Sequence, residues 1–193
     1  MIRLALALAL LLAAAPAAAQ SPDRYRPPNA PDKPVKREGT GAVPTPSRYS
    51  IGSVIKGDRA PDFELALAGG GKAQLSSFRG QWVVVCFCPQ RNYAAIDSVA
   101  RGVPDRVPVL GVVPEKAGTL TAWSAQNKPS ALLLDDSMGD IAALYGAWDL
   151  ERGEPRAGYV IVDPKGFVTR VEFTHRLEPV EAVRAVQYAV TGL

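Results

Sequence analysis

The chain has two cysteines, Cys86 and Cys88, and both fall in the stretch WVVVCFCPQRNYAAI at positions 82–96. A thiolate is an effective nucleophile, and two neighbouring thiols can also form a redox-active disulfide. The stretch has the pattern of a buried strand that passes through Pro89 into a helix, and open α/β sheets bind ligands at that end of their strands. Whether these thiols can react depends on the face they occupy and on their depth.

The two cysteines are separated by one residue, so on a strand their side chains share a face and Phe87 lies on the other. In an extended chain their Cβ atoms lie ~5.5 Å or more apart, which exceeds the ~3.8 Å of a normal disulfide. A bridge therefore needs a bulge or strain, and a strained bridge is oxidising and labile. The simpler interpretation is two small core residues, because free cysteine is among the most buried residue types.

Cys88 is the better candidate for a reactive thiol. It ends the predicted strand beside Pro89, and a positive charge on the nearby Arg91 favours a thiolate. Cys86 lies deeper in the strand and would serve at most as a resolving thiol.

The remaining polar motifs favour structural roles. His175 is the only histidine, and one histidine with two strand cysteines does not make a zinc site, so neither a metal nor a cofactor is predicted. Asp135 and Asp136 are adjacent, so their carboxylates point apart on a strand and favour helix caps or turns over acid–base catalysis. The Gly69-Gly70-Gly71 run lacks the Lys-Ser/Thr of a phosphate loop and predicts a hairpin turn.

The composition indicates one globular domain with a good core. The chain has 193 residues, of which 47% are hydrophobic and 21% are charged. The net charge of +3 argues against a dedicated nucleic-acid-binding protein, which normally carries a strong basic stripe. Two cysteines do not make a disulfide-stapled scaffold, so the fold must rest on its hydrophobic core.

Residues 1–19 have the features of a secretory signal peptide. Arg3 forms a short positive region, an apolar run covers 4–14, and the small residues at 15–19 predict cleavage after Ala19. A membrane anchor is the alternative, but the apolar run is much shorter than the ~20 residues of a spanning helix. No cysteine follows the cleavage site, which argues against a lipoprotein anchor. We therefore expect export to the periplasm or the cell exterior, with no transmembrane segment after cleavage.

Residues 20–50 predict a disordered, proline-rich linker, which leaves a folded domain at 51–193. The segment contains seven prolines and almost no apolar periodicity, so it cannot bury enough surface to offset its ordering entropy. Its basic side chains could contact an anionic wall or membrane surface, although plain solvation accounts for them.

Strands that alternate with helices after residue 51 predict an α/β layered domain. The expected strands lie at 63–67, 82–87, 107–113, 131–134, 159–162 and 167–173. The expected helices lie at 93–101, 120–126, 141–145 and 179–190, with one helical turn at 75–79 that Gly80 ends. Glycine-containing turns at 69–71 and 163–166 predict hairpins.

Four segments carry a family resemblance. In chain order they are GDRAPDFEL (57–65), LSSFRGQWVVVCFCP (75–89), LLLDDSMGDIAALYGAW (132–148) and YVIVDPKGFV (159–168). They resemble the redoxin family, which includes the peroxiredoxins of the alkyl hydroperoxide reductase/thiol-specific antioxidant group and their thioredoxin-like exported relatives. The resemblance covers about residues 52–193. It implies a thioredoxin fold, with a mixed central sheet flanked by helices and an N-terminal hairpin, and the activity of an antioxidant thiol oxidoreductase.

The resemblance also implies where the reactive cysteine should stand, and this chain departs from the pattern there. The peroxidatic motif places a threonine four residues after a proline and a cysteine seven residues after it. Counted from Pro89, the threonine position is Tyr93 and the cysteine position is Ile96. The cysteine pair of the thioredoxin type would stand at Asn92 and Ala95.

Two further residues are the nearest matches to family positions. Arg156 corresponds to the positioning arginine of peroxiredoxins, although it lies one residue too far from Asp163. Pro155 corresponds to the cis-proline of thioredoxins and is also out of register.

We therefore predict an exported redoxin-like domain with a degenerate active site, which binds or scaffolds and has little or no peroxidase activity. Its partner would be an unidentified protein or small ligand at the strand-to-helix loop, contacted by Pro89, Arg91 and Arg156. The alternative is a thiol-dependent oxidoreductase that acts through Cys88 with Cys86, or a peroxiredoxin relative that uses intermolecular chemistry at Cys88 alone.

Overall fold

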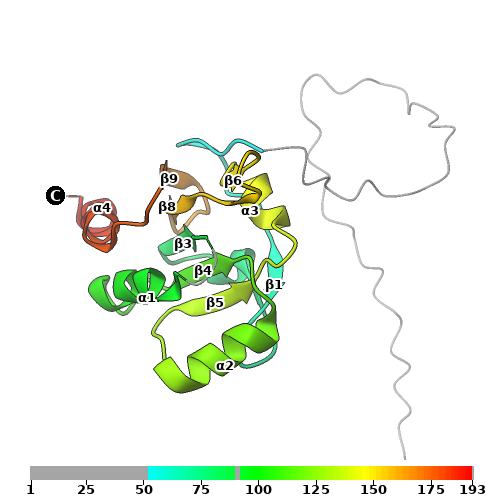
Figure 1. Cartoon of the computed structure of the whole chain (residues 1–193). Coiled ribbons are helices and arrows are strands. Elements are labelled where there is room, and N and C mark those ends of the chain that lie inside the picture. Colours follow the sequence, from blue (N-terminus) through cyan, green and yellow to red (C-terminus); the bar gives the residue numbers. More distant parts are fainter. Residues whose placement is uncertain (1–51, 90–91, 193) are drawn as a thin grey trace, which may run out of the picture. The chain divides into compact units, whose positions relative to one another are not determined.

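The computed structural model describes residues 52–89 and 92–192. The predicted signal peptide, linker and Arg91 lie outside these residues and stay predictions. The described chain forms a five-stranded sheet of order β5-β4-β3-β8-β9 and two small two-stranded sheets (Figure 1). The strands of the large sheet are β3 (Val83–Phe87), β4 (Val109–Val113), β5 (Leu132–Asp135), β8 (Ala157–Val162) and β9 (Val168–Thr174).

The large sheet is mixed. β3 pairs with β4 and β4 with β5 in parallel, whereas β8 runs antiparallel to both β3 and β9. β1 (Glu64–Ala66) and β2 (Lys72–Gln74) form the expected N-terminal hairpin, and the 3-10 turn η1 (Leu75–Phe78) follows it. The predicted α/β class, with a mixed central sheet and an N-terminal hairpin, is confirmed.

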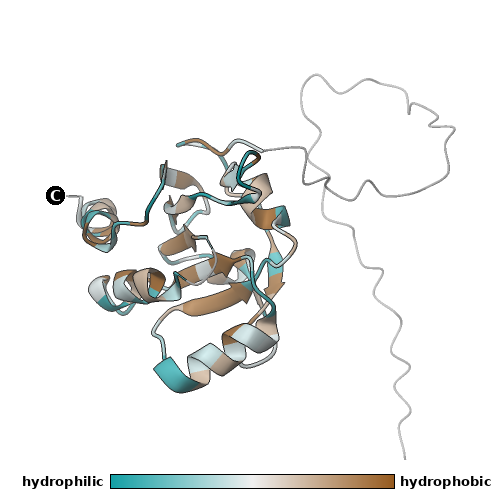
Figure 2. Ribbon diagram, viewed as in Figure 1, coloured by the Kyte–Doolittle hydropathy of each residue, from teal (hydrophilic) through white to brown (hydrophobic). Residues whose placement is uncertain are grey.

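Helices cover both faces of this sheet. They are α1 (Tyr93–Gly102), α2 (Ala117–Asn127), α3 (Asp140–Leu144) and α4 (Pro179–Thr191). α1 follows β3 and α2 follows β4, both helices bury side chains on the same face of the sheet, and α4 packs against α1 there. Ile96, Leu120 and Val186 join one buried cluster on that face, while Ala142 of α3 lies in the cluster of the other face. Figure 2 shows the hydrophobic strands between these layers.

Both faces of β3 are buried, as its continuous run of apolar residues predicts. Val84 and Cys86 belong to the cluster under α1 and α4, and Cys88 joins them. Phe87 belongs to the cluster on the opposite face. The prediction that the two cysteines share a face, opposite Phe87, is confirmed.

Some elements differ from the pattern in the sequence. α2 begins at Ala117, three residues before the expected start at 120. The strand expected from Val107 begins at Val109, since Pro108 has no N–H to donate to a ladder. In addition, β6 (Trp148–Asp149) and β7 (Glu154–Pro155) form a small antiparallel hairpin. Strands of two residues are too short to show an alternating pattern, so hydropathy does not predict them.

The adjacent carboxylates at the end of β5 cap two helices, as predicted. Asp135 accepts the N–H of Ala117 at the start of α2, with an N–O distance of 2.8 Å. Asp136 accepts the N–H groups of Ile141 at 3.1 Å and Ala142 at 2.9 Å, in the first turn of α3. Throughout the part of the chain that the structure describes, no helix has the length and hydropathy needed to cross a membrane.

Candidate functional site

Cys86 lies in the middle of the sheet, where its backbone stands opposite Gly111 of β4 and Tyr159 of β8. Its side chain has no exposed surface. Burial, together with the neighbouring Cys88, raises the pKa of the Cys86 thiol far above its usual range. A thiol that is protonated at neutral pH and closed to solvent is a poor nucleophile.

Cys88 follows the last residue of β3 and is as fully buried as Cys86. Burial raises the pKa of the Cys88 thiol to about 12, although the backbone N–H of Asn92 donates a hydrogen bond to the sulfur and opposes this rise. Both cysteines are free, so no disulfide links them. The sulfur of Cys88 thus lies at the start of α1, beneath the protein surface.

The first turn of α1 faces the core at Tyr93 and Ile96, the two positions predicted from the family motif for its threonine and cysteine. Tyr93 is 4% exposed, and its ring meets that of Trp123 edge-on with centroids 5.3 Å apart. Ile96 has no exposed surface. It packs directly over Gly111, where an added Cβ would lie 3.1 Å from two Ile96 carbon atoms. This turn therefore presents apolar groups to the sheet at these two positions.

A small hollow of about 10 Å³ opens beyond the carboxyl end of β3, with room for about one water molecule. Its lining residues are Pro89, Asp149, Arg152, Glu154, Pro155, Arg156, Ala157, Thr174 and His175. The structure thus brings together Pro89 and Arg156, two of the predicted binding residues. Neither cysteine lines the hollow, and Arg91 lies outside the described residues, so the binding roles stay predictions.

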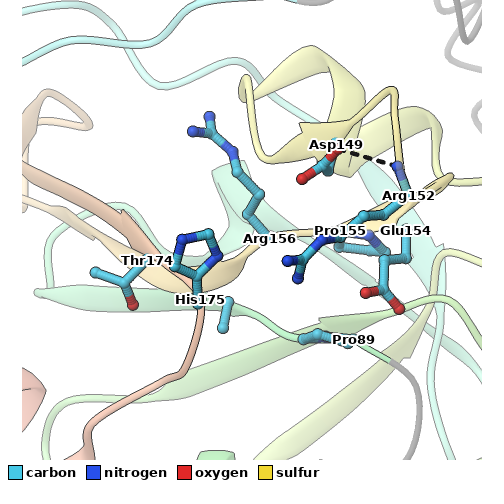
Figure 3. A pocket seen from close by; sticks show the side chains of 9 residues that line it. Pro89, Asp149, Arg152, Glu154, Pro155, Arg156, Thr174 and His175 are labelled. Carbon is cyan, nitrogen blue, oxygen red and sulfur yellow. Dashed lines mark hydrogen bonds between the residues drawn. The ribbon is translucent and has the colours of Figure 1, made fainter.

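The side chain of Arg156 is already engaged within the domain. Its Nη2 donates to the carbonyl oxygen of Gly146, and its guanidinium carbon lies 5.3 Å from the ring centroid of Phe173. Figure 3 shows the guanidinium pointing away from Pro89. No peptide bond among the described residues is cis, so Pro155 does not match the cis-proline of thioredoxins.

The arginine directed into the hollow is Arg152, in the turn of the β6–β7 hairpin (Figure 3). Asp149 Oδ1 accepts the backbone N–H groups of Glu151 at 3.0 Å and Arg152 at 3.1 Å, which holds the turn. Sequence reasoning missed this residue. The available signal was the spacing of Asp149 and Gly153, since aspartate favours the start of a turn and Gly153 has a φ of +66°.

The other titratable groups do not form a catalytic or metal cluster. Across residues 52–89 and 92–192, no three His, Cys, Asp or Glu side chains are placed to hold a metal ion. His175 is exposed and lines the hollow. Burial raises the pKa of Asp136 to about 6. Burial also acts to raise the pKa of Asp135, but hydrogen bonds from Ser137 and Ala117 outweigh it and hold that pKa below its ordinary range.

Comparison with known proteins agrees with this architecture. The curated selenocysteine-containing peroxiredoxin PrxU of Peptoclostridium acidaminophilum is 31% identical over 140 residues, which span 62% of this chain and 68% of that protein. Among solved structures, Mycobacterium tuberculosis AhpC matches with a TM-score of 0.62 at 18% identity, over 72% of this chain and 94% of that chain. The thiol peroxidase from Chromobacterium violaceum matches with a TM-score of 0.63 at 16% identity. The match covers 74% of this chain and 90% of that chain.

These structural likenesses establish the peroxiredoxin-like form of the thioredoxin fold. The family itself follows from sequence, because the model described as the AhpC/TSA family matches residues 56–171, more than half of the chain. The resemblance carried by the four segments is thereby confirmed, and the chain belongs to the AhpC/TSA family.

Proposed function

We propose that this protein is an exported member of the AhpC/TSA family whose peroxidase site is degenerate. Its domain serves to bind a ligand or partner at the loop between β3 and α1, and peroxide turnover is weak or absent. Nucleic acid is not the partner, since the chain's net charge of +3 is small. Export is proposed from the signal-like residues 1–19 alone.

The observation that carries this proposal is the burial of Ile96. Counting from Pro89, Ile96 stands where the family motif has its peroxidatic cysteine, and its side chain has no exposed surface. Peroxide reduction needs a thiolate that attacks the peroxide O–O bond, so the nucleophile must be ionised and accessible. A buried isoleucine supplies neither property.

The burial of the two cysteines adds support. A pKa of about 12 leaves Cys88 almost entirely protonated at neutral pH, and Cys86 is at least as well covered. Compensation by either thiol would therefore require the region around Cys88 to open first. We expect any such opening to make the reaction slow.

Thiol labelling across pH tests the proposal. The folded chain is treated with iodoacetamide from pH ~5 to ~9, with and without prior reduction, and the labelled residues are mapped by mass spectrometry. We expect no label on Cys86 or Cys88 until the protein is denatured. Fast labelling of Cys88 with a midpoint below the free-thiol value of ~8.5 would contradict the degenerate-site proposal.

A second candidate function is a thiol oxidoreductase that acts through Cys88. The hydrogen bond from the Asn92 N–H to the sulfur favours it, because the same donor at the start of α1 would stabilise a thiolate. A relative of the chain is named a peroxiredoxin, so hydrogen peroxide is the substrate to test. The degenerate-site proposal expects Cys88→Ser to leave peroxide consumption unchanged, whereas the alternative expects the variant to abolish it.

A further inference from the structure

A larger depression, here called the Trp148 groove, adjoins the hollow and shares Arg152, Glu154 and Pro155 with it. Its volume of about 380 Å³ falls in the range of small-molecule sites. The remaining lining residues are Pro114, Ser137, Met138, Trp148 and Gly153. The groove lies beyond the carboxyl ends of β4 and β5, which is where open α/β sheets bind ligands.

Part of the groove wall is apolar, beside the polar side chains of Ser137, Arg152 and Glu154. Pro114, Trp148 and Pro155 contribute ring surfaces, and Met138 contributes a thioether side chain that is 58% exposed. Methionine and aromatic side chains together suit flat or branched hydrocarbon groups, because the flexible thioether adapts to shape and packs well on rings. The wall therefore fits the apolar part of a ligand.

One arginine, Arg152, lines both the hollow and the groove. Arg101, Arg170, Arg176 and Arg184 each pair with a carboxylate, but Arg152 forms no ion pair with any carboxylate among the described residues. Asp149 already accepts two backbone N–H groups with Oδ1, and Figure 3 shows the Glu154 carboxylate directed toward Pro89. The guanidinium fork of Arg152 is therefore available to a ligand, and its geometry matches a carboxylate.

We propose that the Trp148 groove binds an organic carboxylate with an apolar body, which packs on Trp148 and Met138 while the carboxylate pairs with Arg152. The inference rests on the proposed binding role, since the groove adjoins the hollow at Pro89, and it names the class of ligand. Two sources share this chemistry. One is a small free acid, and the other is the C-terminus of a polypeptide whose last residue is large and apolar.

Nuclear magnetic resonance titration of the isotope-labelled full chain tests the proposal. The probes are phenylbutyrate and a short peptide that ends in phenylalanine, each compared with its neutral amide at millimolar concentration. The signals followed are the indole N–H of Trp148, assigned with Trp148→Phe, the Nε–H of Arg152 and the amide of Gly153. We expect at least one acid to shift all three signals and its amide to bind much more weakly.

The matched variants assign the effect to the charge on Arg152. Arg152→Gln should weaken binding of the acid by about tenfold or more, since hydrogen bonds to a charged group contribute most of the discrimination. Arg106→Gln, which changes an exposed arginine in the turn before β4, should leave binding unchanged. Glu154→Gln should strengthen binding about two- to fivefold, because it removes a competing negative charge from the wall.

The outcomes separate the sources and the proposals. Binding of phenylbutyrate points to a free acid and binding of the peptide alone to a polypeptide C-terminus, and either result supports the inference. Absence of binding by both acids, equal binding of acid and amide, or equal effects of Arg152→Gln and Arg106→Gln would overturn it. None of these binding measurements involves a thiol, so absence of ligand binding would leave the degenerate-site proposal standing. Iodoacetamide labelling of Cys88 tests the degenerate-site proposal alone.

Discussion

At the residue scale, burial decides the chemistry that Cys88 can perform. Its sulfur accepts a hydrogen bond from the start of α1, which is an arrangement that activates thiols elsewhere. The absence of exposed surface outweighs that bond and leaves the pKa at about 12. The same residue type in the same place would be reactive if the surrounding turn left it open to water.

The close packing of Ile96 on Gly111 leads to a stability prediction. A Cβ added at Gly111 would lie 2.8 Å from Leu133 Cδ2 and 3.1 Å from two Ile96 carbons, so Gly111→Ala should overpack the core. We expect unfolding free energy to fall by about 1–2 kcal/mol, measured by urea denaturation. The control Gly118→Ala meets no atom within 4 Å and should raise stability by up to about 1 kcal/mol. Equal effects of the two variants would contradict this account of the packing.

The buried carboxyl of Asp136 predicts a pH dependence of stability. Burial raises its pKa from the ordinary 3.8 to about 6, so the folded state binds this proton more tightly than the unfolded state. The resulting stabilisation is fully present below about pH 4 and is lost as pH rises through about 6, with a size on the order of 3 kcal/mol. Asp136→Asn cannot titrate there.

The measurement is the unfolding free energy of wild type and Asp136→Asn between pH ~4 and ~7. We expect the difference between the two proteins to change in favour of wild type as pH falls through about 6. Parallel curves over this range would show that Asp136 keeps its ordinary pKa in the folded state.

At the element scale, two short features position the site. The β6–β7 hairpin presents Arg152 between the hollow and the Trp148 groove. The loop after β5 supplies Ser137 and Met138 to the same groove. Asp135 at the end of β5 and Asp136 in the loop hold the starts of α2 and α3. Both features are loops or near-loops, carried by the rigid sheet beneath them.

Asp135 caps α2 from outside that helix, and this contact predicts the effect of its removal. Asp135→Ala leaves the N–H of Ala117 without its carboxylate acceptor, so we expect a loss of about 1 kcal/mol in unfolding free energy at neutral pH. Asp105→Ala, at an exposed residue of the α1–β4 connection, should change stability by less than about 0.5 kcal/mol. A loss no larger than that of the control would argue that water replaces the cap at no cost.

At the scale of the whole molecule, the order of the sheet predicts which amides exchange slowly with solvent. β3 lies between β4 and β8 and is buried on both faces, whereas β6–β7 is a separate two-stranded ladder. Amides of β3 and β4 should therefore exchange only through near-global unfolding, and those of β6–β7 through local opening. Hydrogen exchange followed by mass spectrometry measures this order. Protection of β6–β7 equal to that of β3 would mean that the hairpin belongs to the same cooperative unit.

Elements with a strong local signal were predictable, and the two-residue strands β6 and β7 were not. The apolar run of β3 and the glycine turn between β1 and β2 carry strong local signals, and both elements form where expected. The helix at 179–190 was also expected, but its Val180 is 62% exposed while Ala182 and Ala185 are buried. The packing of α4 on α1 decides which side of that helix faces inward, and hydropathy alone does not.

The sequence by itself determined the family, the α/β class and the common face of Cys86 and Cys88, because these depend on local order and on the two-residue period of a strand. By resemblance to the family motif, it also predicts that Tyr93 and Ile96 stand at the family's reactive positions. Only the tertiary structure decided that both cysteines are buried, that Arg156 turns toward Gly146 and Phe173, and that Arg152 faces the site instead. Burial and side-chain direction arise from contacts between segments far apart in the chain, and no local pattern encodes them.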